Sequence, residues 1–322
     1  MGAAFEQTKA NEIDQGQKEW GKNPKLPEVN RFSEKSNSRK EAAEPERPNA
    51  KEQALETVSR CIDELNEALE QGQSEKFEHY LAFLAKFHNY SINNSMLIGA
   101  QCPNATHVAS YDKWKELGRQ VKKGEKGIGI FAPMLTKKTI EVDGSNGEKE
   151  KREVKKLNGF RIAKVFDVSQ TSGEPLPETE KVTGDPGSYL SKLESIISEN
   201  SIELVYDYPE DRALGVSSGG RITVRPDLDP PEKFAVLAHE LAHELLHKGE
   251  RRNETNRQVR ETEAEAVAFV VSKAVGLDSV ARSSDYISLY QGDSAVLKES
   301  IHFIQKTASR IIWGLTKHNS QD

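Results

Sequence analysis

The sequence predicts an α+β protein with two folded domains, and three observations lead to this prediction. Apolar residues recur every three or four positions over several stretches, which is the period of amphipathic helices. Shorter runs rich in Ile, Val and Phe lie between turn residues, as β-strands do. Polar stretches rich in Pro, Gly and Glu interrupt both patterns and have the composition of tails and linkers.

These polar stretches divide the 322 residues into four parts. Residues 1–50 carry too few apolar side chains to offset the entropy lost on ordering, so a disordered tail is expected there. Residues 51–170 are predicted to form the first domain, residues 171–187 a linker, and residues 188–322 the second domain. Both domains then have an ordinary size for a folded unit.

The first domain is predicted to be a small helical and β-hairpin module. From Lys51 onward, apolar residues recur at helical spacing, and the helix is expected to end at Gly72. The polar residues 143–156 are expected to be a loop between two paired strands. The remaining expected elements are helices over residues 77–87 and 94–100 and strands over residues 128–135 and 160–168.

The second domain is predicted to combine helices with a small antiparallel sheet. Residues 213–216 and 221–225 flank Ser217-Ser-Gly-Gly220, a turn sequence that tolerates positive φ, and so predict a hairpin. Asp229-Pro-Pro-Glu232 begins a helix, because Asp caps exposed N–H groups and Pro is tolerated in the first turn. The other expected elements are a strand over residues 202–206, helices over residues 189–199, 257–275 and 296–315, and a short helix around Tyr286.

Composition excludes several classes of protein. No apolar run is long enough for a membrane span and the first residues lack the layout of a signal peptide, so a cytoplasmic protein without a membrane partner is expected. Two cysteines, Cys61 and Cys102, exclude a disulfide framework, and their separation does not fit a zinc motif. The formal net charge of −6 gives no overall indication of nucleic-acid binding.

His239-Glu-Leu-Ala-His243 places two histidines four residues apart, on one side of a helix. Two imidazole nitrogens in that arrangement can bind one zinc ion at about 2.0–2.1 Å. Glu240 directly follows the first histidine, so its side chain would lie beside the metal without binding it. It is therefore predicted to be the catalytic general base, which takes a proton from a water on the metal.

A catalytic zinc site of this kind needs a third protein ligand. The next helix offers Glu261, Glu263 and Glu265. Glu261 and Glu265 are four residues apart and share a face, whereas Glu263 points elsewhere. We expect Glu261 to bind the metal and Glu265 to orient a metal-bound histidine from behind.

His247 is an alternative third ligand, because it continues the four-residue spacing from His243. However, His239 and His247 would be roughly 12 Å apart along a straight helix, too far to share one ion. His247 is expected to end the helix, where the helix dipole favours a cation. A solvated helix face is the alternative for the whole motif, but apolar residues on most sides of this helix favour partial burial of the histidines.

The first domain carries a basic segment, Lys113 to Lys138, with eight basic and two acidic residues. Proteins that bind single strands combine cations for phosphates with aromatic faces for bases. Core packing is the alternative for the aromatic residues, and a solvated turn is the alternative for the lysines. The candidate nucleic-acid-binding residues are Tyr90, Asn93, Asn94, Trp114, Arg119, Lys122, Lys123 and Lys126.

The second domain resembles the zincin-type metallopeptidase domain of ArdC-like antirestriction proteins and, more distantly, the ImmA/IrrE family of regulatory metallopeptidases. The similar segments are Arg221-Ile-Thr-Val-Arg225, His239-Glu-Leu-Ala-His243 and Glu261-Thr-Glu-Ala-Glu265. The resemblance implies that His239, His243 and Glu261 hold zinc and that Glu240 is the general base.

The first domain resembles the N-terminal single-stranded-DNA-binding domain of the same proteins, from about Phe77 to Gln170. The similar segments include Trp114, Gly118-Arg119 and Val121-Lys-Lys-Gly-Glu-Lys-Gly127. The best-known members have Tyr-Ser-Gly-x-Asn where this chain has Tyr90-Ser-Ile-Asn-Asn94. This difference indicates a divergent branch of the family.

Together the resemblances imply a single-stranded-DNA-binding protein with a zinc metallopeptidase domain and an antirestriction or DNA-protection role on a mobile element. Two alternatives remain. One is a DNA-coating protein whose zinc is not catalytic. The other is a regulatory metalloprotease of the ImmA/IrrE type that cleaves a repressor, with a first domain that binds protein. The sequence does not identify a protein substrate.

Overall fold

The computed structural model describes residues 49–143, 149–176, 184–209, 213–277, 286 and 294–317. These residues combine helices with small sheets, which confirms the α+β prediction. The tail expected over residues 1–50 lies outside the described residues, apart from its last two. Of the short helix expected around Tyr286, only this tyrosine is described; it is buried, with its ring 5.2 Å from that of Phe77.

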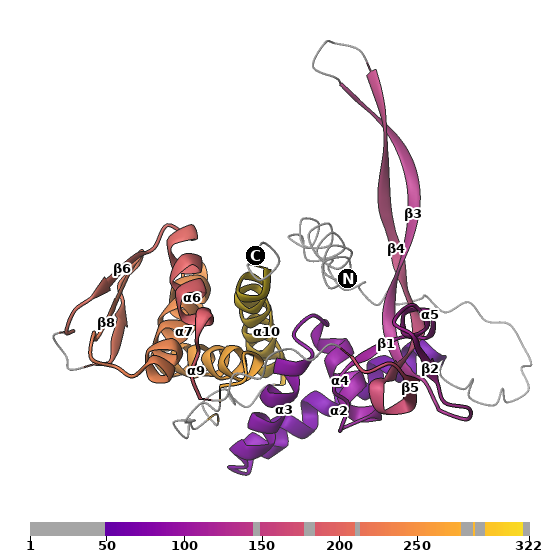
Figure 1. The fold of residues 1–322 in the computed structure, drawn as a ribbon, viewed down its shortest axis with the longest axis horizontal. Helices are drawn as coiled ribbons and strands as arrows, with labels where there is room; N and C mark the ends of the chain where they lie inside the picture. The colour runs from indigo at the N-terminus through magenta and orange to yellow at the C-terminus, as the bar shows by residue number, and fades with distance from the viewer. Residues whose placement is uncertain are drawn as a thin grey trace, which may run out of the picture. The chain divides into compact units, whose positions relative to one another are not determined.

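Three helices open the first domain and pack their apolar faces together. The first begins with a capping box, in which the Asn49 side chain accepts from the backbone N–H of Glu52 and the Glu52 carboxylate accepts from the N–H of Asn49. It ends before Gly72, whose φ is 74°, as the sequence predicts. The helices are α2 (Ala50–Glu70), α3 (Ser74–Lys86) and α4 (Ile92–Gln101) (Figure 1).

A long antiparallel ribbon follows, formed by β3 (Ile128–Asp143) and β4 (Lys149–Asp167), with β1 (Val108–Ser110) paired to β4 (Figure 1). Both predicted strands are confirmed. The loop predicted over residues 143–156 is wrong for Asp143, which ends β3, and for residues 149–156, which belong to β4; residues 144–148 lie outside the described residues. Residues 149–156 are extended despite their many charges because each of them pairs with a residue of β3 between Thr136 and Asp143.

Short elements complete the first domain around a buried carboxylate. Asp167 ends β4 and accepts hydrogen bonds from the backbone N–H groups of Thr106, His107 and Ser169. Burial acts to raise the pKa of Asp167, but these hydrogen bonds outweigh it and lower the pKa below its usual value. The short elements are α5 (Tyr111–Glu116), β2 (Arg119–Val121), the 3₁₀ turn η1 (Val168–Gln170) and β5 (Thr171–Gly173), which pairs with β2.

The second domain contains a three-stranded sheet in the order β6-β8-β7. The central strand is parallel to β6 and antiparallel to β7, so the sheet is mixed. The predicted hairpin turn is confirmed, since Gly219 and Gly220 have φ of 74° and 99°. The elements are α6 (Ser188–Glu199), β6 (Glu203–Tyr206), β7 (Gly215–Ser217) and β8 (Arg221–Val224).

Within the described residues, four helices follow the sheet. Asp229 is the N-cap of the first, as predicted, but its side chain makes no capping hydrogen bond. The next two residues, Pro230 and Pro231, have no N–H group, which leaves fewer donors to cap. The helices are α7 (Pro230–Leu246), α8 (Glu250–Glu254), α9 (Arg257–Ala274) and α10 (Ser294–Lys317).

The described residues form two hydrophobic clusters, a smaller one within the first predicted domain and a larger one that spans both. The larger cluster includes Val58 of α2, Leu81 of α3, Leu237 of α7 and Val270 of α9. Helix α10 contacts α2 and α4 as well as α6, α7 and α9. None of the helices in the described ranges is both long enough and apolar enough to cross a membrane.

Candidate metal centre and nucleic-acid interface

Helix α7 presents His239 and His243 on one side, because four residues make just over one helical turn. Most of the other side is buried against the core, through residues such as Leu237, Leu241 and Ala242. The two imidazole rings lie 4.8 Å apart and remain partly exposed. The apolar face of the helix therefore fixes the direction in which both histidines point.

Helix α9 packs against α7 and brings Glu261 to the two histidines. The Nε2 atoms of His239 and His243 are 3.1 Å apart. The Oε2 atom of Glu261 lies 3.6 Å from the first nitrogen and 3.5 Å from the second. Three ligands at tetrahedral angles, each about 2.0–2.1 Å from an ion, would be about 3.4 Å apart. The three side chains thus fit one divalent metal ion.

Glu265 supports this arrangement from the far side of His239. Its Oε2 atom lies 3.2 Å from Nδ1 of His239, which leaves Nε2 directed at the candidate metal position. Burial acts to lower the pKa of His239, but hydrogen bonds with Glu261 and Glu265 outweigh it and raise the pKa to about 9. The same hydrogen bonds with the histidines lower the pKa of Glu261. The structure therefore brings together all four residues predicted to build the metal site.

Glu240 lies beside this cluster in a confined space. Its side chain is buried, and burial raises the pKa of its carboxyl group, although the neighbouring histidines oppose the shift. Strand β7 covers it closely: a Cβ atom built on Gly215 would lie 3.0 Å from Cγ of Glu240. A carboxylate with a raised pKa next to the metal position is suited to accept and return a proton.

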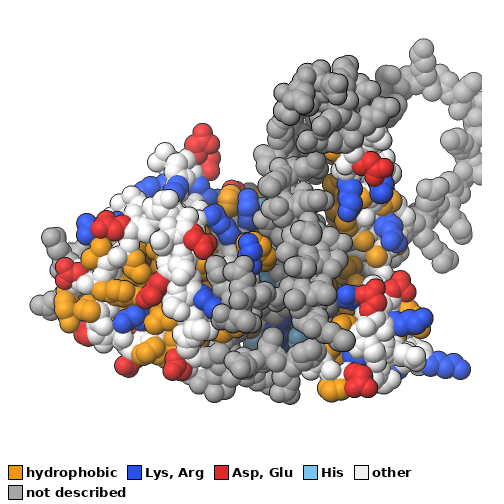
Figure 2. All heavy atoms as spheres, turned by 45° about the horizontal axis from the view of Figure 1, so that its top comes forward, with side chains coloured by type: hydrophobic (Ala, Val, Ile, Leu, Met, Phe, Trp, Pro, Cys, Tyr) orange, Lys and Arg blue, Asp and Glu red, His pale blue; other side chains and the backbone are white. Residues whose placement is uncertain are grey.

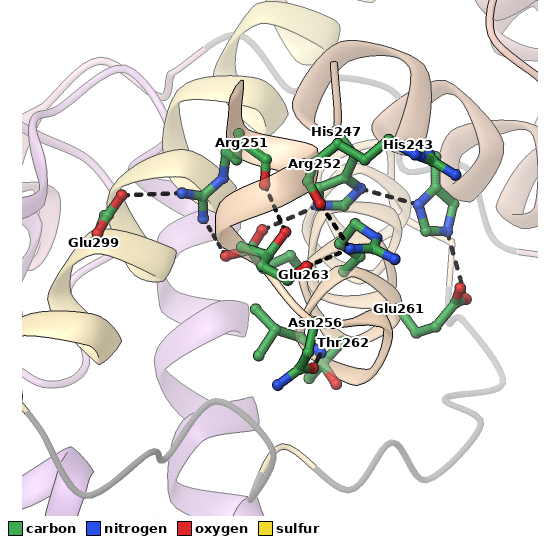
Figure 3. A network of polar contacts seen from close by, with 12 residues as sticks. His243, His247, Arg251, Arg252, Asn256, Glu261, Thr262, Glu263 and Glu299 are labelled. Carbon is green, nitrogen blue, oxygen red and sulfur yellow. Dashed lines mark hydrogen bonds and ion pairs between the residues drawn. The ribbon is translucent and has the colours of Figure 1, made fainter. Parts of the chain in front are cut away.

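His247 departs from its prediction in one respect. It ends α7 as expected, since it is the C-cap residue. The prediction of a dipole-stabilised cation is wrong, because the side chain is buried and burial lowers the pKa of His247. Its Nδ1 atom lies 3.0 Å from Nδ1 of His243, and its Nε2 atom lies 3.1 Å from Oε2 of Glu263 (Figure 3).

Glu263 and Glu244 are buried carboxylates that the sequence did not single out. Glu263 is fully buried and pairs with Arg251 of α8 as well as with His247 (Figure 3). Glu244 accepts hydrogen bonds of 2.8 Å from the backbone N–H groups of Gly219 and Gly220. Glu244 therefore joins α7 to the turn between β7 and β8. Four-residue spacing identified Glu261 and Glu265. It could not identify Glu263 and Glu244, because their partners Arg251, Gly219 and Gly220 belong to other elements of the chain.

Most of the predicted nucleic-acid-binding residues make contacts inside the first domain. The Trp114 ring is buried, and its Nε1–H donates to the carbonyl of Phe166 at 2.8 Å, so in this structure it has no face free for base stacking. The Tyr90 hydroxyl donates to the carbonyl of Val108, and burial raises its pKa to about 12. For Trp114 the core alternative thus replaces the stacking prediction.

Asn94 and Arg119 are also engaged within the fold. Asn94 donates from its amide group to the carbonyl of Phe131 and accepts from the N–H of the same residue, as a neighbouring strand would. Arg119 donates to the Thr171 hydroxyl and to the carbonyls of Gly173 and Glu174. Both side chains hold β-structure in place, which leaves them few groups for a ligand.

The predicted lysines are exposed. Lys122 donates to the carbonyl of Ser169 at 2.8 Å, while Lys123 and Lys126 extend from the turn before β3. Lys126 also lines a hollow of about 530 Å³ together with Lys164 of β4, Gly127, Ile128 and Gln101. The sequence did not single out Lys164, which reaches this hollow because β3 and β4 pair in register. Asn93 is half-buried in the first turn of α4.

Charge on the molecular surface is mixed. On the face shown in Figure 2, basic and acidic side chains of the described residues are interspersed. The hollow has two lysines, Lys126 and Lys164, among its lining residues. Within the described part of the chain, neither lysine forms an ion pair with a carboxylate.

Comparisons with known proteins match two families. Residues 49–166 match the N-terminal domain of anti-restriction factor ArdC, and residues 200–290 match the IrrE N-terminal-like domain of the M78 peptidases. An uncharacterised protein of Bacillus anthracis, pXO2-81, is 27% identical over 316 aligned residues, which cover 85% of this chain and 54% of that protein. The chain thus spans about half the length of this relative.

Two crystal structures of the antirestriction protein ArdC from plasmid R388 are also similar, each at 20% sequence identity. The metal-free structure aligns over 71% of this chain and 86% of its own, with a TM-score of 0.40. The Mn(II)-bound structure aligns over 70% and 89%, with a TM-score of 0.41.

Proposed function

We propose that this chain, which joins the N-terminal domain of the ArdC antirestriction family to an IrrE-like metallopeptidase domain, binds single-stranded DNA and hydrolyses a peptide bond with the help of zinc. One observation carries the metallopeptidase part. The ligand atoms of His239, His243 and Glu261 lie 3.1–3.6 Å apart, close to the spacing of three ligands on one zinc ion.

Each residue of the site has a defined part in this proposal. His239, His243 and Glu261 hold the metal, and Glu265 orients His239. Bound zinc would supply a Lewis acid that polarises a carbonyl group and lowers the pKa of a water molecule. Glu240 accepts the proton of the attacking water and returns it to the leaving nitrogen, for which its buried position and raised pKa are suitable.

Metal analysis of the purified protein tests the site. We expect about one zinc ion per chain in the wild type and almost none in His239→Ala. His79→Ala is the matched control, because His79 is an exposed histidine on α3. Stoichiometric zinc in His239→Ala, or loss of zinc in the control, would contradict the assignment of the ligands.

The DNA-binding part is supported by the family of the first domain and by the two lysines at the hollow, which form no ion pair with any described carboxylate. We propose that phosphates of single-stranded DNA bind near Lys126 and Lys164 at the hollow, and that the exposed Lys122 and Lys123, which precede Lys126 in the chain, add further contacts. Each neutralised phosphate contributes about 0.7 to the slope of log affinity against log salt for single strands. Affinity should therefore fall as the salt concentration rises.

Titration of a labelled oligonucleotide at several salt concentrations tests this part. The double variant Lys126→Ala/Lys164→Ala should bind more weakly and reduce the salt slope by about 1.4. Lys122→Ala/Lys123→Ala should act in the same direction. The control Lys298→Ala/Lys306→Ala removes the same charge from exposed positions on α10 and should bind as the wild type does. Equal salt slopes in all three variants would exclude these lysines as phosphate contacts.

Two alternatives give different results with Glu240→Gln, which keeps the metal ligands. If the protein only coats DNA, this variant should protect incoming DNA from restriction in cells as well as the wild type does. If the chain is a regulatory protease of the IrrE type, oligonucleotide binding should be absent while Glu240 remains essential. Our proposal expects both DNA binding and a requirement for Glu240.

A further inference from the structure

Behind the candidate metal ligand His243, a chain of polar contacts leads into the protein (Figure 3). Nδ1 of His243 lies 3.0 Å from Nδ1 of His247, and Nε2 of His247 lies 3.1 Å from Oε2 of Glu263. The other oxygen of Glu263 accepts from Arg251, whose second amino group donates to Glu299 of α10 at 3.0 Å. We call His247, Glu263 and Arg251 the buried relay.

The side chains of the buried relay are polar but lie in the protein interior, where the loss of hydration is unfavourable. The exposed fractions are 3% for His247, 0% for Glu263 and 8% for Arg251. Burial of an ionised carboxylate is unfavourable unless cations and N–H donors surround it. Glu263 receives both, from Arg251 and from His247. The Arg251 guanidinium also lies over the Phe303 ring, 3.6 Å from its centre.

The contacts are compatible with one set of proton positions. For Nε2 of His243 to offer a lone pair to a metal, its proton must be on Nδ1. That Nδ1–H then donates to Nδ1 of His247, so the proton of His247 is on Nε2. The Nε2–H donates to the Glu263 carboxylate, which can only accept. Each member thus fixes the tautomer of the one before it.

We propose that His247 and Glu263 are positioning residues for the metal ligand His243, which hold its ring orientation and its tautomer. The inference rests on the proposed metal site of His239, His243 and Glu261. In this proposal, the two histidine ligands are held in place in different ways. A carboxylate, Glu265, contacts His239 directly. The corresponding carboxylate for His243 is Glu263, which acts through the imidazole of His247.

Two substitutions at residue 247 separate positioning from packing. His247→Leu keeps an apolar volume but removes the acceptor for His243. His247→Asn places an amide oxygen where Nδ1 was, and so restores that acceptor. Loss of such a supporting contact typically weakens metal binding about ten- to a hundredfold. We expect this loss in His247→Leu, a recovery of most of the affinity in His247→Asn, and a loss of about tenfold in Glu263→Gln.

Two measurements on the full chain give the result. Competition with a chromophoric chelator gives the zinc affinity, and the visible spectrum of the cobalt-substituted protein reports the ligand geometry directly. We expect an altered cobalt spectrum in His247→Leu and a spectrum close to that of the wild type in His247→Asn. Glu299→Gln is the control, because it changes only the half-exposed outer end of the chain of contacts and should leave both readings unchanged.

The outcomes distinguish this inference from the proposed function. A wild-type protein without zinc affinity would overturn the metal site itself. Wild-type zinc binding with equal affinity and an identical cobalt spectrum in His247→Leu would overturn only the positioning role. If His247→Leu does not fold, Glu263→Gln decides: weaker zinc binding in the folded variant supports the role, and unchanged affinity overturns it.

Discussion

Glu244 is predicted to stabilise the hairpin that lies beside the candidate catalytic base. Its carboxylate accepts two hydrogen bonds of 2.8 Å, from the N–H groups of Gly219 and Gly220, and its side chain is buried. Glu244→Gln conserves the shape but removes the charge and turns an NH₂ group toward one of the two donors. A hydrogen bond to a charged group contributes about 1.5–3 kcal/mol, so we expect unfolding free energy to fall by about 2 kcal/mol.

Urea denaturation of the metal-free protein and amide hydrogen exchange measure this effect. The midpoint should fall without a change in slope, and the amides of Gly219 and Gly220 should exchange faster than in the wild type. Glu203→Gln is a matched control, because Glu203 is an exposed glutamate in the same sheet whose pairing with Arg221 contributes less than about 1 kcal/mol. Unchanged exchange of both glycine amides in Glu244→Gln would refute this reasoning.

Two further predictions concern close packing and acid stability. Gly215→Ala would place its Cβ 2.6 Å from Cγ1 of Val236 and 3.0 Å from Cγ of Glu240, so urea denaturation should show a loss of about 1–3 kcal/mol. Zinc content should be unchanged, because neither contact is with the side chain of a proposed ligand. Asp167→Asn should cost about 1–3 kcal/mol at neutral pH. Because the folded-state pKa of Asp167 is lowered, its carboxylate stabilises the fold above the unfolded pKa of about 3.9 and this contribution is lost as pH falls through the folded pKa. Denaturation at decreasing pH should therefore bring variant and wild type together; a constant difference would contradict the hydrogen-bond account.

Local sequence signals predicted the elements that depend on neighbouring residues. Helical periodicity located α2, the Asp229-Pro-Pro-Glu232 sequence located the start of α7, and the glycine pair of Ser217-Ser-Gly-Gly220 predicted the hairpin turn. Four-residue spacing also placed Glu261 and Glu265 on one face of α9, where the structure has them. These predictions succeed because a helical turn or a tight turn is decided within a few residues.

Predictions that depended on distant partners were less successful. The charges of residues 143–156 indicated a loop, but pairing between β3 and β4 supplies backbone hydrogen bonds that do not depend on side-chain polarity. Trp114 lies in a basic segment, yet its indole N–H finds the carbonyl of Phe166, 52 residues away. His247 has the position of a helix-terminal cation, but its side chain is buried between helices and contacts Glu263 of α9.

Helix α10 shows why composition alone does not reveal how the two predicted domains pack. Its Glu299 pairs with Arg251, which also pairs with Glu263 of α9. One to three turns further along, Gln305 and Ser309 donate hydrogen bonds to the backbone carbonyls of Tyr90 and His88, between α3 and α4. The last helix of the second domain therefore anchors a connection in the first. Because its apolar face also contributes Ile304 and Ile311 to the shared core, separating the two halves would expose part of that core to water.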